Sequence, residues 1–146
     1  MQGSKFKILI VEDDEDHILL IKAAFRDYSD QIEFHTAGNG LEALSLIQKH
    51  HQTELFFNLI LLDLNIPMMN GYEFLKKVKL EQELSRIPVI ILTTTDNEDL
   101  LKKAYSCGAN SVIKKDKFFD QENNIGKIFF QYWMQYASLS KSQQST

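Results

Sequence analysis

Side chains that can bind a cation or a phosphate group directly follow four short apolar runs of the sequence. They are Glu12, Asp13 and Asp14 after residues 8–11, Asp63 after residues 59–62, Thr93, Thr94 and Thr95 after residues 89–92, and Lys114 and Lys115 after residues 111–113. Open parallel α/β sheets bind ligands outside the carboxyl ends of their strands. The pattern therefore predicts a site of carboxylates, hydroxyls and ammonium groups at one edge of such a sheet.

Asp63 is the carboxylate that a purely structural role explains least well. Acidic residues after a strand commonly cap a helix, and that role accounts equally well for Asp14 or Asp16. After Asp63, however, the sequence favours no helix before Asn70 and Gly71. Asp63 is therefore predicted to lie at a strand end beside other carboxylates.

Carboxylates gathered in this way require a positive partner. Two such charges about 4 Å apart repel by about 1 kcal/mol in water and by about 4 kcal/mol at an effective dielectric constant of about 20. Oxygen ligands favour Mg²⁺ over Zn²⁺, and the histidines either lie in different elements or point apart on one helix. Lys115 offers a second positive charge that suits a phosphate, whereas Lys114 is expected to point to the opposite side.

Five runs rich in Ile, Val and Leu alternate with segments of helical periodicity. The predicted strands cover residues 8–11, 32–34, 59–62, 89–92 and 111–113. Four of them lack polar alternation, as strands covered on both faces do, whereas Ile32-Glu33-Phe34 alternates and is expected nearer an edge. Between the strands, residues such as Ile18, Ile21 and Phe25 recur at helical spacing. This alternation predicts an α/β fold of five strand-helix units.

Helix boundaries follow from residues that start or stop helices. The third and fourth helices are predicted at about residues 72–82 and 97–107, with Asp96 before the fourth and Gly108 ending it. A fifth helix is predicted to begin near Phe119 or Gln121.

Length and composition favour one domain, predicted over residues 1–137, followed by a polar tail at residues 138–146. Lys and Arg total 16 against 20 Asp and Glu, and this net charge of −4 gives no general reason to bind nucleic acid or an anionic membrane. The single cysteine cannot form an intrachain disulfide, and no export signal or membrane span is visible in the sequence. The cytoplasm is the expected compartment.

Four motifs, in this order, resemble the receiver domain of two-component response regulators. They are Ile-Leu-Ile-Val-Glu12-Asp13-Asp14, Leu-Leu-Asp63-Leu-Asn-Ile-Pro67-Met-Met-Asn-Gly71, Pro88-Val-Ile-Ile-Leu-Thr93-Thr and Gly108-Ala-Asn-Ser-Val-Ile-Lys-Lys115. The resemblance spans about residues 6–134. The segment Phe129-Phe-Gln-Tyr-Trp133 resembles the C-terminal segment of single-domain regulators that pair with phytochrome histidine kinases.

The resemblance implies a doubly wound, flavodoxin-like sheet of five parallel strands in the order 2-1-3-4-5. It also implies a phosphoryl site with bound Mg²⁺. The implied metal ligands are Glu12, Asp13, Asp63 and the backbone carbonyl of Asn65, and the implied phosphoryl-site residues are Asp63 as phosphoacceptor, Thr93 and Lys115. These roles agree with phosphoryl transfer, which needs a nucleophile, charge neutralisation and a fixed cation.

By the same resemblance, the chain is expected to be a stand-alone response regulator and not an enzyme with steady turnover. Its expected partner is a sensor histidine kinase or a histidine phosphotransfer protein. Two alternatives stay open: an aspartate-nucleophile phosphatase of the haloacid dehalogenase type, and a pseudo-receiver that binds partners without phosphorylation. The phosphatase needs an acid two residues after its nucleophile, where this chain has Asn65.

Two residues depart from the usual receiver pattern. Asp116 follows Lys115 where receivers usually carry a proline after a cis peptide bond, so the loop after the fifth strand is expected to differ. Val112 stands where an aromatic switch residue is usual, so the familiar coupling of a threonine with an aromatic ring cannot operate unchanged. Asn65 and Thr95 resemble the receiver positions that tune autodephosphorylation, and because neither is a strong general base, no fast built-in hydrolysis is expected.

Aromatic residues concentrate near the C-terminus, where residues 118–136 hold seven of the chain's 16. Packing a helix on a sheet needs an apolar arc of a little over about 100°, and the apolar residues here spread over roughly twice that. The surplus is expected to be exposed as a protein-binding or homodimer face. The candidate residues are Phe129, Tyr132, Trp133 and Tyr136.

Overall fold

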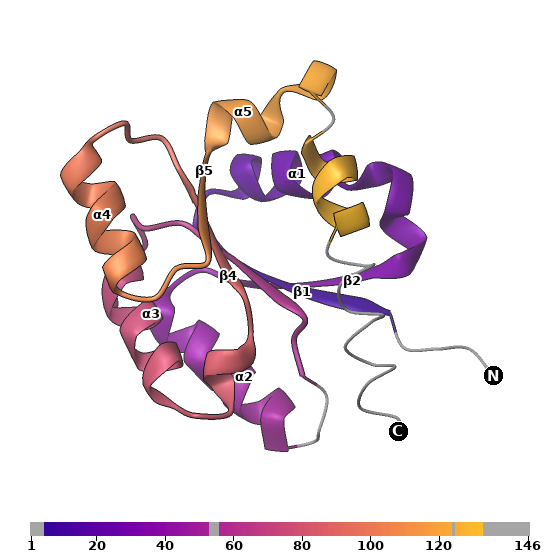
Figure 1. The fold of residues 1–146 in the computed structure, drawn as a ribbon. Coiled ribbons are helices and arrows are strands. Elements are labelled where there is room, and N and C mark those ends of the chain that lie inside the picture. Colours follow the sequence, from indigo (N-terminus) through magenta and orange to yellow (C-terminus); the bar gives the residue numbers. More distant parts are fainter. Residues whose placement is uncertain (1–4, 53–55, 124, 133–146) are drawn as a thin grey trace.

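A five-stranded parallel sheet forms the centre of the molecule (Figure 1). The computed structural model describes residues 5–52, 56–123 and 125–132. The strands are β1 (Phe6–Val11), β2 (Ile32–Ala37), β3 (Leu59–Leu62), β4 (Val89–Thr93) and β5 (Ser111–Lys114), in the order β2-β1-β3-β4-β5. The predicted fold class and strand order are confirmed, and the alternating strand β2 lies at an edge as expected.

Helices cover both faces of the sheet. They are α1 (Glu15–Ala24), α2 (Gly40–Gln52), α3 (Gly71–Leu80), α4 (Glu98–Ser106) and α5 (Lys115–Phe119), followed by a helical segment at residues 125–132. Figure 1 shows α1 and α5 on one side of the sheet, and α2 and α3 on the other. Each side has its own apolar core, because successive side chains of a strand point to opposite faces. None of the described helices has the length and apolar character that a membrane span needs.

Two helix boundaries differ from the prediction. Helix α4 is capped by Asn97, whose Oδ1 accepts hydrogen bonds from the N–H groups of Asp99 (2.9 Å) and Leu100 (3.2 Å). The predicted cap, Asp96, instead pairs with Lys114. The fifth helix begins at Lys115 and not near Phe119 or Gln121, because Lys114 is extended and the backbone turns helical directly after it.

An aromatic cluster packs residues 125–132 against α1 and the sheet. Phe25 lies at its centre, with ring centroids 5.7 Å from Phe118, 6.4 Å from Phe129 and 6.5 Å from Phe130. The ring of Phe130 also packs 4.5 Å from that of Tyr28, and Phe130 is buried. Phe129, one of the four residues of the predicted interaction face, is therefore partly taken up by this cluster.

Part of the predicted interaction face is nevertheless exposed. The exposed fraction of Tyr132 is 59%, whereas Phe129 is half-buried in the aromatic cluster. Ile128, which was not part of the predicted face, is 61% exposed. Trp133, Tyr136 and the predicted domain boundary after residue 137 lie outside the described residues. The homodimer stays a prediction.

The close approach of residues 125–132 to α1 requires glycine at position 126. A Cβ atom there would lie 1.9 Å from the carbonyl oxygen of Ala24. We therefore expect Gly126→Ala to lower the free energy of unfolding by about 1–3 kcal/mol, measured by denaturant titration. Gly38→Ala is the matched control, since its nearest neighbour would be 4.0 Å away. Equal effects of the two substitutions would contradict this packing.

Candidate phosphoryl site

The carboxylates meet because β1 and β3 are neighbours in register. Val11 is paired with Leu62, so the residues that follow them, Glu12 and Asp63, leave the sheet side by side. The N–H of Asp63 donates to the carbonyl of Val11 (3.0 Å), which extends the pairing by one residue. Glu12, Asp13 and Asp63 each bring one carboxylate oxygen within 4.8 Å of the others. This acidic cluster was predicted from the sequence.

The three carboxylates differ in their surroundings. Glu12 is 2% exposed, Asp63 is half-buried and Asp13 is exposed. Burial raises the pKa of Glu12 above its ordinary value, and the hydrogen bond from Lys115 partly offsets this. The negative charge of Asp63 acts with burial to raise the same pKa. The cluster therefore combines one carboxylate held in the interior with two that a solvent-borne group can reach.

Lys115 supplies the fixed positive charge. Its Nζ donates to Glu12 Oε1 at 2.7 Å and to Asp63 Oδ2 at 3.3 Å, and its side chain is only 4% exposed. The neighbouring Lys114 pairs instead with Asp96, in the loop before α4. The described residues contain no cis peptide bond, so Asp116 follows Lys115 through a trans bond. Lys115 lies beside Asp63 with aspartate in place of the usual proline.

Asp63 does not cap a helix. Its Oδ1 accepts a hydrogen bond from the N–H of Asn65 (3.2 Å), and α3 begins only at Gly71, after its own cap Asn70. The loop between them closes tightly, since a Cβ on Gly71 would lie 2.6 Å from the Cα of Leu64. The loop thus leaves Oδ2 of Asp63 directed towards Lys115.

Thr93 ends β4 at the same edge of the sheet. The residue is 3% exposed, and its Oγ1 accepts a hydrogen bond from the N–H of Thr95 (3.2 Å). The Oγ1 of Thr95 in turn accepts from the N–H of Asn97 (3.1 Å), the cap of α4. Hydrogen bonds therefore connect the end of β4 to the start of α4. The contact of Thr93 with a phosphoryl oxygen stays a prediction.

Sequence reasoning missed two contacts, of which the second lies at the site. The N–H of Val112, at the place of the usual aromatic residue, donates to the hydroxyl of Tyr105 on α4 (3.2 Å). His17 contacts Lys115, with Nδ1 2.8 Å from Nζ. No local signal in the sequence indicates this contact, because it depends on how α1 packs against α5.

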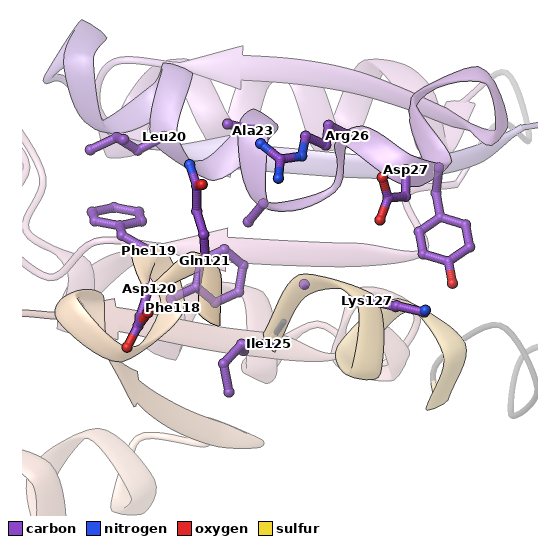
Figure 2. A pocket seen from close by; sticks show the side chains of 13 residues that line it. Leu20, Ala23, Arg26, Asp27, Phe118, Phe119, Asp120, Gln121, Ile125 and Lys127 are labelled. Atoms are coloured by element: carbon purple, nitrogen blue, oxygen red, sulfur yellow. The ribbon is translucent and has the colours of Figure 1, made fainter. Parts of the chain in front are cut away.

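A separate pocket lies between α1 and the segment after α5. Figure 2 shows Gln121 extending from that segment towards α1, with Arg26 and Asp27 on the α1 side and Lys127 opposite. None of the residues that line this pocket belongs to the acidic cluster. The pocket and the acidic cluster are therefore separate sites.

The acidic cluster has the donor set of a divalent metal site. Its ligands are carboxylate oxygens, which suit Mg²⁺ or Mn²⁺, and an exposed Asp13 leaves room for retained water. Lys115 neutralises part of the charge from the buried side, so a bound cation would face the solvent side. The residues present fit such an ion.

Comparison with known proteins agrees with the geometry. The family model of the response regulator receiver domain matches residues 8–125. The chain belongs to this family, whose members act in two-component signalling. It is 33% identical over 132 residues to the probable methanogenesis regulatory protein FilR2 of Methanothrix harundinacea, covering 88% of this chain and 84% of FilR2.

Two cyanobacterial proteins are also similar. The response regulator Rcp1 of Synechocystis is 31% identical over 134 residues, covering 90% of this chain and 91% of Rcp1, and its Mn²⁺-bound structure matches with a TM-score of 0.74. The phosphorylated cyanobacterial phytochrome response regulator RcpA matches with a TM-score of 0.78 at 31% identity, covering 90% of this chain and 95% of RcpA. The predicted likeness to phytochrome-associated regulators is confirmed.

The buried pair of Glu12 and Lys115 predicts a pH-dependent loss of stability. Lys115→Met would leave Glu12 without its positive partner, and we expect the free energy of unfolding to fall by about 3 kcal/mol at pH 7. The folded-state pKa of Glu12 would rise further above its unfolded value. Because stability from a raised pKa is lost as pH rises through it, the deficit should be smaller at pH 5.

Denaturant unfolding at both pH values measures this deficit. Lys114→Met is the matched control, because it removes the neighbouring ammonium group, which pairs with exposed Asp96 and not with the cluster. A deficit in Lys115→Met that is independent of pH would argue against a buried, charged Glu12.

Proposed function

We propose that this receiver domain takes up a phosphoryl group on Asp63 from a phosphohistidine of a sensor histidine kinase or phosphotransfer protein. The observation that supports this most is the position of Lys115 Nζ, 3.3 Å from Asp63 Oδ2 and anchored by Glu12. A positive charge fixed beside a half-buried carboxylate suits a group whose oxygens gain negative charge during transfer. The similarity to RcpA, described as phosphorylated, supports the same role.

The transfer needs little covalent work from the protein. A carboxylate oxygen of Asp63 attacks phosphorus, the P–N bond to the donor imidazole breaks, and the departing imidazole takes a proton from solvent. Lys115 stays protonated and pairs with a phosphoryl oxygen. A bound Mg²⁺, held by Glu12, Asp13, Asp63 and the Asn65 carbonyl, would neutralise the charge on the other phosphoryl oxygens.

The alternatives are less well supported. A haloacid-dehalogenase-type phosphatase needs an acid two residues after the nucleophile, and the side chain of Asn65 at that position is an amide, which is no acid. A pseudo-receiver would not require Lys115 to be buried against two carboxylates. We therefore propose a phosphoacceptor without steady turnover. A phytochrome kinase is the partner suggested by the similarity to RcpA.

We propose that the signal leaves through two regions. One is the hydrogen-bonded path from Thr93 through Thr95 to the start of α4. The other is the exposed surface of Tyr132, which belongs to the predicted homodimer face, together with Ile128. Helix α5 begins at Lys115, so a shift of that residue is carried towards the aromatic cluster beneath this surface.

Phosphorylation can be tested with a small donor. Incubation with acetyl phosphate and Mg²⁺ should add one phosphoryl group by intact mass, and Asp63→Asn should abolish the addition. Asp30→Asn, an exposed aspartate in the segment after α1, should be phosphorylated as the wild type is. Addition to Asp63→Asn, or continuous hydrolysis of a phosphomonoester by the wild type, would contradict the proposal.

Metal binding can be tested without phosphorylation. A ligand that binds only the folded state stabilises it, by about 2.7 kcal/mol at about 100 times its Kd. Mg²⁺ should therefore raise the Tm of the wild type and of Asp30→Asn, and should raise it far less in Asp13→Asn. An equal rise in all three proteins would place the ion elsewhere.

A further inference from the structure

His17 contacts Lys115, although the two residues are 98 positions apart in the sequence. Lys115 Nζ has three acceptors: Glu12 Oε1 at 2.7 Å, His17 Nδ1 at 2.8 Å and Asp63 Oδ2 at 3.3 Å. An ammonium group carries three hydrogens, so each has one partner. The hydrogen bonds to Glu12 and His17 are the short ones, and that to Asp63 is the long one.

The chemistry of the contact fixes the roles of both groups. A lysine ammonium can only donate, so Nδ1 of His17 accepts and the imidazole proton lies on Nε2. The imidazole is therefore a neutral acceptor, with Nδ1 3.7 Å from Glu12 Oε1 and Nε2 3.9 Å from Asp14 Oδ2. It restrains the ammonium without adding a third negative charge that would compete with a phosphoryl group.

Both the backbone and the ring of His17 have further contacts. The backbone N–H of His17 donates to the capping carboxylate of Asp14 (3.3 Å), which fixes the start of α1. The ring packs against Phe119 at the end of α5, with centroids 5.7 Å apart. His17 therefore joins the start of α1 to both ends of the short helix that begins with Lys115.

We propose that His17 is a positioning residue for the phosphorylation of Asp63, an inference that rests on the proposed function. When a phosphoryl oxygen replaces Asp63 Oδ2 as the third acceptor, Glu12 and His17 keep the other two hydrogens of Lys115. The ammonium thus keeps three partners and one orientation. Without the imidazole nitrogen, one buried N–H loses its partner and the direction of Lys115 is less restrained.

Two substitutions separate the acceptor from the ring. His17→Phe keeps a ring against Phe119 but removes the acceptor, whereas His17→Asn removes the ring and places Oδ1 at the same number of bonds from Cα as Nδ1. The probe is beryllofluoride with Mg²⁺, a phosphoryl mimic, together with the rate of phosphorylation by acetyl phosphate. Thermal unfolding checks that both variants fold.

We expect His17→Phe to bind beryllofluoride about tenfold more weakly and to be phosphorylated about tenfold more slowly, as the loss of one buried hydrogen-bond partner implies. His17→Asn should stay within about threefold of the wild type. A Phe variant that behaves as the wild type, or an Asn variant as impaired as the Phe variant, would overturn the proposal.

A spectroscopic measurement tests the hydrogen bond directly. In ¹⁵N-histidine-labelled protein, Nδ1 of His17 should be unprotonated and Nε2 protonated, and a protonated Nδ1 would overturn the proposal. This measurement needs no phosphorylation. A wild type that takes up no phosphoryl group would therefore refute the proposed function. The ¹⁵N spectrum would still show whether Nδ1 of His17 accepts a hydrogen bond from Lys115.

Discussion

The buried ion pair of Lys115 with Glu12 is the interaction on which the rest of the site depends. Both side chains are almost completely removed from water, and their charged atoms lie 2.7 Å apart. Such a pair offsets the loss of hydration only when its geometry is good and its remaining hydrogens are satisfied. His17 and Asp63 provide those further acceptors. The pair thus anchors one positive charge beside Asp63 while Asp13 stays open to solvent.

The fold holds this pair from both sides of the site. Glu12 leaves β1 and its N–H donates to the carbonyl of Ala37 in β2 (2.9 Å), so the sheet fixes its backbone. Lys115 begins α5, and Phe118, one turn later, is buried against Phe25. The aromatic cluster therefore holds α5 in place, and with it the backbone of Lys115. This connects the packing of the C-terminal helical segment with the chemistry of Asp63.

The sequence predicted what depends on local patterns. Apolar runs located the strands, and the residues that follow them identified the acidic cluster, because parallel strands bring their carboxyl ends together. Local patterns did not show which of two adjacent polar residues caps α4. Asn97 is the cap, and Asp96 instead pairs with Lys114. The contact of His17 with Lys115 depends on tertiary packing between α1 and α5, which no local pattern encodes.

A crystal structure with beryllofluoride and Mg²⁺ is the most direct test of the central claim. The account predicts beryllofluoride on Asp63, Lys115 Nζ within hydrogen-bond distance of a fluorine while still bonded to Glu12, and the metal held by carboxylates that include Asp13. Beryllofluoride on another residue, or Lys115 turned away from it, would contradict the account.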